Sequence, residues 1–240
     1  MHGPRSSPSG EADLKRRAGY RAVEEFVRSG MAVGLGTGST ASWAIRRVGE
    51  LLREGVLEDV VCVPTSERTA EAARALGIPL ATLAETRPRV TIDGADEISP
   101  DLSAIKGRGG ALLREKIVAF ASESFVLVAD ETKPVERLGE GVVPVEVEPF
   151  GWQATLRALS ALGCEASLRR AEGSDDPFVT DGGHYTVDCL FPPIEDPAAL
   201  EREIKHVPGA LECGLFVGMA EAAVVARSSG EVEIMERRGS

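Results

Sequence analysis

Short β-branched, apolar runs alternate with amphipathic helical patterns through the first half of the chain, and this alternation constrains the fold more than any other feature. Apolar residues recur there either at helical spacing or in runs of strand length. The expected strands are Met31–Leu35, Val60–Val63, Val90–Asp93 and Phe125–Ala129, and the expected helices are Glu11–Arg28, Ala41–Arg53, Ser66–Leu76 and Ala111–Ser122. Strands and helices in alternation predict an α/β fold, a Rossmann-like domain with a mostly parallel sheet.

The pattern changes after about Gly139. The next expected elements, in the order strand, helix, strand, strand, helix, are Val142–Val147, Pro149–Leu162, Cys164–Arg170, His184–Leu190 and Pro197–Lys205. This order predicts a smaller ferredoxin-like α+β domain over 139–210, with 11–138 and 211–240 forming the α/β catalytic domain. Three later short strands are expected to return to the main sheet, at Gly214–Val217, Ala222–Ala226 and Val232–Met235.

Residues 1–10 are polar and rich in Pro, Ser and Gly, without the apolar core of a signal peptide. They predict a disordered N-terminal tail. No apolar run approaches the roughly 18 residues that span a bilayer. A cytoplasmic protein without a membrane partner is therefore expected.

The net charge of −11 argues against nucleic acid as a partner, because phosphate backbones favour basic surfaces. It leaves room for a small anionic substrate in a local cationic pocket. The four cysteines are widely spaced and predict reduced, buried thiols. The three histidines lack metal-ligand spacing, so no metal site is expected.

Gly34-Leu-Gly-Thr-Gly-Ser-Thr40 follows an expected strand and opens an expected helix. Its glycines allow close approach of a ligand, and amides at a helix N-terminus attract an anion such as phosphate. An ordinary strand–helix turn with a Ser/Thr cap would look the same. The segment matches neither the dinucleotide-binding motif nor the ATP-binding Walker A loop, because Ser39 stands in place of the third glycine and no Gly-Lys-Ser/Thr follows.

Acidic residues gather where the strand Val90–Asp93 ends, in Asp93-Gly-Ala-Asp-Glu97. They could be turn formers and a helix cap, but Asp93 ends an apolar strand and is expected to be partly buried. Lys106-Gly-Arg-Gly-Gly110 then precedes a helix that carries Glu115. The loop could be merely flexible and Glu115 merely an exposed helical residue. In the functional interpretation, the loop is a backbone nest whose lysine binds an anion or polarises an oxygen.

Together these segments resemble the ribose-5-phosphate isomerase family, type A. The shared motifs are G-x-G-T-G-S-T at 34–40, D-G-A-D-E-I at 93–98, K-G-R-G-G-A-L-L-R-E-K-I-V-A at 106–119 and A-D-E-T-K at 129–133. The resemblance covers nearly the whole chain after the tail. It implies the reversible interconversion of D-ribose 5-phosphate and D-ribulose 5-phosphate in the non-oxidative pentose phosphate pathway, by a homo-oligomer (dimer or tetramer) that needs no metal or organic cofactor.

The resemblance also implies the site residues. Glu115 would be the base that moves a proton through an enediolate, with Asp93 and Lys106 as the other catalytic groups. The implied substrate-binding positions are Lys15, Thr37, Gly38, Ser39, Thr40, Asp93, Gly94, Ala95, Asp96, Lys106, Gly107, Arg108, Gly109 and Lys133. The chain departs from the commonest family pattern at Arg108, where a glycine is usual. If that position needs a positive φ, arginine would cost about 1 kcal/mol; otherwise its side chain could point outward or lend a cation to the mouth of the pocket.

Two other functions fit parts of the sequence. A related amino-sugar phosphate deaminase would use a histidine for ring opening, and no histidine lies among the candidate residues. A non-catalytic phosphosugar sensor could keep the phosphate loop but would not need Glu115, Asp93 and Lys106 together. The sequence therefore favours the isomerase.

Overall fold

The computed structural model describes residues 8–237 of the chain. Contacts divide the chain into two compact units. Unit 1 comprises the residues up to Gly94, Val118–Lys133, and the residues from Ala220 onward, and unit 2 comprises Ala95–Ile117 and Pro134–Met219. The sequence-based division at 139 and 210 stays a prediction; the two units differ from it in placing 95–117, 134–138 and 211–219 in unit 2.

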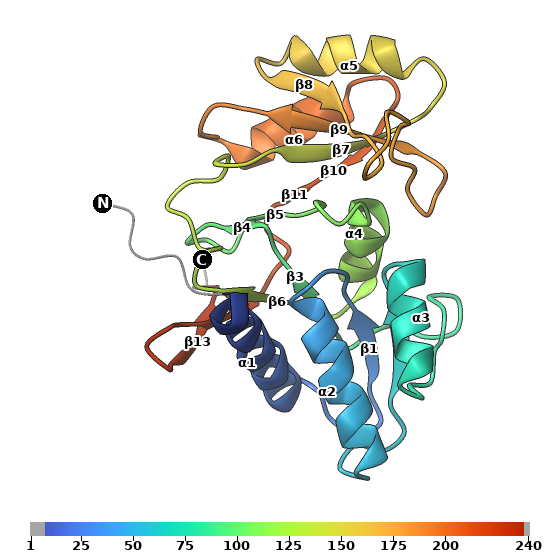
Figure 1. Ribbon diagram of the computed structural model, residues 1–240, viewed down its shortest axis with the longest axis vertical. Coiled ribbons are helices and arrows are strands. Elements are labelled where there is room, and N and C mark those ends of the chain that lie inside the picture. The colour runs from blue at the N-terminus through green and yellow to red at the C-terminus, as the bar shows by residue number, and fades with distance from the viewer. Residues whose placement is uncertain (1–7, 238–240) are drawn as a thin grey trace. The chain divides into compact units, whose positions relative to one another are not determined.

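Unit 1 is built on a six-stranded sheet in the order β13-β12-β6-β3-β1-β2 (Figure 1). The strands are β1 (Ala32–Leu35), β2 (Val61–Pro64), β3 (Val90–Gly94), β6 (Ser124–Asp130), β12 (Ala222–Ala226) and β13 (Val232–Glu236). Every neighbouring pair is parallel except β12 and β13, which run antiparallel. The predicted Rossmann-like, mostly parallel sheet is confirmed.

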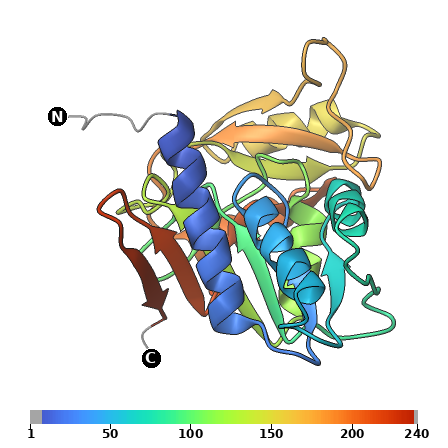
Figure 2. The same ribbon diagram turned by 60° about the horizontal axis from the view of Figure 1, so that its bottom comes forward.

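Helices cover this sheet and bury its strands. The helices before β3 are α1 (Pro8–Phe26), α2 (Ala41–Arg53) and α3 (Glu67–Ala75). In Figure 2, α1 and α2 lie side by side across one face of the sheet. All four residues of β1 and all five of β12 are buried, as expected for a parallel sheet covered on both faces. Val33, Ile92 and Val126 of the strands pack in one core with Ala22 and Val48 of the helices.

The strand order reverses at β1, which lies between β2 and β3. In open α/β sheets, ligands bind at the carboxyl ends of the strands at such a reversal. Here the amide of Gly36 donates to the carbonyl of Ile92 at 2.9 Å, so the loops after β1 and β3 start side by side. These are the loops that carry two of the sequence motifs.

Unit 2 contains a four-stranded antiparallel sheet in the order β10-β7-β9-β8 (Figure 1). Its elements in chain order are β7 (Val143–Val147), α5 (Trp152–Ser160), β8 (Glu165–Leu168), β9 (Tyr185–Leu190), α6 (Pro197–Lys205) and β10 (Ala210–Cys213). The succession βαββαβ, with the first and third strands central, confirms the predicted ferredoxin-like α+β arrangement.

Unit 2 also holds a small three-stranded sheet, β11-β5-β4, that corrects one prediction. Its strands are β4 (Glu97–Ile98), β5 (Ala104–Ile105) and β11 (Leu215–Phe216). The predicted strand Gly214–Val217 was assigned to the main sheet, but β11 pairs antiparallel with β5. Leu215 and Ile105 are buried together in the core of unit 2, and this apolar burial fixes the pairing. β12 and β13 do return to the main sheet.

The remaining helix, α4 (Leu112–Ala121), begins in unit 2 and passes into unit 1 after Ile117. At the N-terminus, residues 1–7 of the predicted tail lie outside the described residues. Pro8 to Gly10 are helical rather than disordered. The N–H groups of the first helical turn have no intrahelical acceptors, so proline loses no hydrogen bond there. Within residues 8–237, no helix is both long and apolar enough to cross a membrane.

Candidate active site

The loop after β1 is a glycine-rich turn that opens α2. A Cβ added to Gly36 would lie 2.1 Å from Oδ1 of Asp93, so only glycine fits there. Gly38 has a φ of +118°, which glycine adopts at little cost. Thr40 is the N-cap of α2, yet its side chain makes no capping hydrogen bond. The amides and hydroxyl at this helix start suit an anion.

A cluster of four buried hydroxyl groups, one of them in the loop itself, holds the loop in place. Thr37 Oγ1 lies 2.8 Å from the hydroxyls of Thr65 and Ser66 and 3.0 Å from that of Thr69. Thr69 in turn donates to the carbonyl of Gly36 at 2.9 Å, and Ser66 caps α3. Each of the four is 6% exposed or less, so these bonds are shielded from water. Thr65, Ser66 and Thr69 were not among the predicted site residues, although a serine ahead of a helix is a typical N-cap.

Asp93 is the last residue but one of β3 and is fully buried. Its Oδ1 accepts hydrogen bonds from the amides of Thr37 at 2.9 Å and Gly94 at 2.7 Å. The structure therefore brings together two predicted site residues of unit 1, Thr37 and Asp93. The expected burial of Asp93 is confirmed.

In unit 2, Lys106 and Glu115 form a buried ion pair. Lys106 Nζ lies 3.1 Å from Glu115 Oε2, and the two side chains are 2% and 3% exposed. Lys106 follows β5, and Glu115 lies in the first turn of α4. A carboxylate and an ammonium in contact and away from water can exchange protons and stabilise negative charge on a neighbouring oxygen.

The loop between Lys106 and α4 is held by the protein on several sides. Its first residue, Gly107, has a φ of +110° and lies against Leu112. Arg169 donates from Nη1 to the carbonyls of Gly107 at 2.9 Å and Arg108 at 3.2 Å. The amide of Lys106 donates to Gly214 at 2.9 Å. The loop is therefore not merely flexible.

Asp96 and Arg108 lie together at the outer side of this loop. Asp96 Oδ2 accepts from the amide of Arg108 at 3.1 Å, and Arg108 Nε lies 3.8 Å from Asp96 Oδ1. Arg108 does not adopt a positive φ, so replacing the usual glycine brings no backbone strain. Its side chain is 52% exposed and points outward, which is one of the expected outcomes.

Glu97, the third carboxylate of the motif, has a different task. Its side chain is buried and accepts hydrogen bonds from the amides of Gly139 at 2.7 Å, Glu140 at 3.3 Å and Gly141 at 2.5 Å. Glu97 therefore fixes the segment that leads into β7.

The other predicted positions lie at the surface or partly exposed. Ser39 and Gly109 are exposed, and Gly94 and Ala95 are half-buried. Lys15, on α1, pairs with Glu11 one turn earlier. Lys133 follows β6, where its amide donates to the carbonyl of Asp130 at 3.2 Å. Both lysines belong to unit 1.

The sequence of the chain is similar to those of known proteins over most of its length. Residues 61–230 match the family described as ribose 5-phosphate isomerase A (phosphoriboisomerase A). Ribose-5-phosphate isomerase A of Gloeobacter violaceus is 56% identical over 225 residues, which cover 92% of this chain and 95% of the relative. A probable chloroplastic ribose-5-phosphate isomerase of Arabidopsis thaliana is 47% identical over 94% of this chain and 83% of its own length.

Solved structures give the same result. The ribose 5-phosphate isomerase of Plasmodium falciparum superposes with a TM-score of 0.90 at 40% identity, covering 95% of this chain and all of that one. A D-ribose-5-phosphate isomerase in complex with phospho-erythronic acid has a TM-score of 0.90 at 38% identity, over 94% of this chain and 98% of its own. The deaminase and sensor alternatives therefore give way to the isomerase. The chain belongs to the ribose-5-phosphate isomerase A family, whose members interconvert ribose 5-phosphate and ribulose 5-phosphate.

Proposed function

We propose that this isomerase works through an enediolate, with Glu115 as the one group that moves the proton between the two carbons. The observation that carries the proposal is the buried contact of 3.1 Å between Glu115 and Lys106. The carboxylate removes the proton from C2 of the open-chain aldose, and the electron pair left behind forms the enediolate. Return of that proton to C1 gives the ketose. One group suffices, because the proton leaves and returns on neighbouring carbons.

Lys106 stabilises the negative oxygen of the enediolate. A buried ammonium is already oriented, so it needs no rearrangement as charge develops on the substrate. The hydroxyl proton at C2 must also move to the oxygen at C1. We assign hydroxyl proton transfer and ring opening to Asp93, whose Oδ1 is held by two amides and whose orientation is therefore fixed.

The phosphate group is proposed to bind at Thr37 to Thr40. The support is a helix N-terminus with an uncapped Thr40 and a loop fixed by four hydroxyls. Lys15 and Lys133 are proposed to add positive charge. Anchoring the remote end of the substrate places the reacting carbons, and such binding energy can be used for orientation. Gly94 to Asp96 and Gly107 to Gly109 complete the proposed substrate contacts.

The variant Glu115→Gln tests the proposal. It keeps the size of the side chain but cannot accept the proton, so we expect kcat to fall by about 10²–10⁴-fold. The measurement is ribulose 5-phosphate formation from ribose 5-phosphate, together with calorimetric binding of phospho-erythronic acid to show that the site still forms. Glu71→Gln, at an exposed position of α3, is the control and should turn over normally. Near-normal turnover by Glu115→Gln would remove Glu115 as the base.

We further propose a cytoplasmic homo-oligomer, as the family resemblance implies. Sedimentation of the purified protein tests its assembly state, and fractionation of the source cells tests its location. A sedimentation coefficient of a single 25.4 kDa chain at working concentrations would contradict the proposed homo-oligomer. Recovery in another compartment would contradict the proposed cytoplasmic location.

A further inference from the structure

Lys116, the residue after Glu115, is buried and fully hydrogen-bonded. Its Nζ donates to Glu201 Oε1 at 2.8 Å, to Glu212 Oε1 at 2.8 Å and to the carbonyl of Leu215 at 2.6 Å. An ammonium has three donors, and three acceptors meet them here. Its side chain is 9% exposed. Such burial indicates a role for Lys116 other than keeping the surface of a helix soluble.

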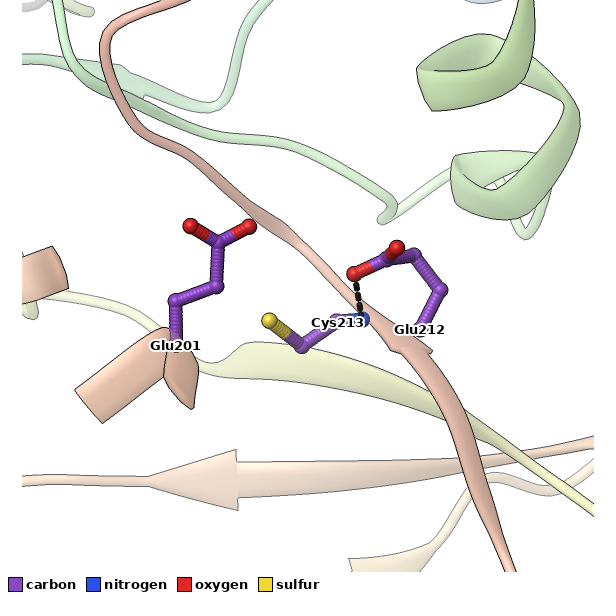
Figure 3. A group of neighbouring side chains, drawn as sticks. All are labelled: Glu201, Glu212 and Cys213. Atoms are coloured by element: carbon purple, nitrogen blue, oxygen red, sulfur yellow. Dashed lines mark hydrogen bonds between the residues drawn. The ribbon is translucent and has the colours of Figure 1, made fainter. Parts of the chain in front are cut away.

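The acceptors of Lys116 belong to a cluster that would otherwise resemble a metal site. Among residues 8–237, one group of potential ligand atoms lies within 4.8 Å of one another: those of Glu201, Glu212 and Cys213. Figure 3 shows these side chains, Glu201 on α6 and the other two on β10. Burial raises the pKa of the Cys213 thiol to about 11, so it stays protonated at neutral pH. The ammonium of Lys116 is therefore the cation that this cluster binds.

The charges around Lys116 keep it ionised. Burial alone would lower the pKa of Lys116, but the neighbouring Cys213 and Glu212, together with the hydrogen bonds to Glu201 and Glu212, hold the pKa above its ordinary value of 10.5. A neutral lysine would lose the ion pairs that justify its burial. The contact is thus a permanent one at physiological pH.

Phe216 connects this network with the proposed catalytic pair. Its ring centroid lies 4.9 Å from Lys116 Nζ and 5.3 Å from Lys106 Nζ. A cation within about 6 Å of an aromatic face is attracted to it. The ring of Phe216, on β11, thus contacts both lysines. Lys116 follows Glu115 in the chain, and Lys106 forms the ion pair with Glu115.

We propose that Lys116 is a positioning residue for the base. Its ammonium ties the first turns of α4 to α6, β10 and β11. Successive residues of a helix are related by a fixed rotation, so α4 cannot turn or slide without moving Lys116 and Glu115 together. The network thereby holds the Glu115 carboxylate at its distance of 3.1 Å from Lys106. The inference rests on the proposed role of Glu115.

The test compares two lysines that bind the same glutamate. Lys116→Met releases α4, and a misplacement of about 1 Å can cost about 100-fold in rate. We expect kcat to fall by about 10–100-fold, with KM for ribose 5-phosphate within about twofold of wild type. Lys205→Met is the control: Lys205 Nζ lies 3.0 Å from Glu212 Oε2, but Lys205 is on α6 and its side chain is 47% exposed. Its kcat should stay within twofold of wild type. Equal effects of the two variants would overturn the proposal.

Further variants separate positioning from stability. Lys116→Met removes the cation that Glu201 and the buried Glu212 share, so the double variant with Glu212→Gln should recover thermal stability. We expect its kcat to stay low; recovery of kcat along with stability would show a structural role only. Glu201→Ala also releases Lys116 from α6 at a partly exposed position that tolerates truncation, and its kcat should fall severalfold. Wild-type kcat there would contradict the proposal even if both Lys116 variants failed to fold.

Failure of this inference differs from failure of the proposed base. If Glu115→Gln is inactive while Lys116→Met and Glu201→Ala keep wild-type kcat, Glu115 remains the base and Lys116 has no positioning role. If Glu115→Gln is active, the proposed base itself is wrong.

Discussion

Glu115 illustrates what a single residue gains from its surroundings. In the sequence it stands between Arg114 and Lys116 on an ordinary helix, where most glutamates are exposed. In the structure it is 3% exposed and touches Lys106. Helical periodicity could not predict this, because the partner comes from a loop nine positions earlier. Only the family resemblance identified it.

At the same scale, Gly36 has no tolerance for a side chain. A Cβ would lie 2.1–2.5 Å from three atoms of Asp93. We expect Gly36→Ala to displace Asp93, to lower kcat/KM at least tenfold and to cost about 1–3 kcal/mol of unfolding free energy. Steady-state kinetics and urea unfolding measure the two effects. Wild-type values in both would mean that the β1 loop shifts freely, contrary to its hydrogen bonds.

At the scale of elements, the hydrogen bonds of Lys116 attach α4 to α6, β10 and β11. Burial by itself would raise the pKa of Glu212. The charge and the hydrogen bond of Lys116 lower the pKa by more than burial raises it, so it lies below the ordinary value of 4.5. The folded protein therefore binds a proton at Glu212 less readily than the unfolded chain does. The stabilisation from Glu212 is present above about pH 4.5 and is lost as the pH falls through the lower, folded-state pKa.

This sign gives a prediction for the attachment of α4 to α6 and β10. The urea midpoint of wild type should exceed that of Glu212→Gln at pH 7, and the difference should shrink as the pH is lowered from 5 to 3, the range of an ordinary to a depressed carboxyl pKa. Glu71→Gln serves as the exposed control, with no such trend expected. A difference that grows in acid would reverse the assigned sign.

At the scale of the whole molecule, long and regular patterns were predictable and short ones were not. The strands of the parallel sheet are continuous apolar runs, because both faces are buried, and the sequence displays them directly. β4, β5 and β11 have two residues each, too few for any periodicity. Gly214–Val217 was therefore assigned to the main sheet, although Leu215 is buried against β5.

The candidate site divides in the same way. Motifs with glycines and carboxylates at strand ends were visible, because strand ends and helix starts have known chemistry. The residues that support these motifs were not visible. In the sequence Thr65 looks like an ordinary residue before a helix, Thr69 like an ordinary helical residue, and Lys116 like a solvent-exposed lysine. Their roles depend on partners that are distant in sequence.

The whole enzyme also allows a prediction about metal removal. In the proposed mechanism Lys106 supplies the positive charge, and the cluster of Glu201, Glu212 and Cys213 is occupied by Lys116. Dialysis against EDTA should therefore leave kcat unchanged. A loss of activity that a divalent cation restores would require a different electrophile.

The ring of Phe216, shared by two lysines, sets a limit on how this enzyme can be altered. In a library of random variants, we expect Phe216 to be exchanged only together with Lys106 and Lys116 or not at all, since a change of the ring removes a partner of both lysines. Arg108, at the exposed edge of the loop, should accept many replacements. A designer seeking a new sugar specificity would therefore begin at Arg108 and leave the ring untouched.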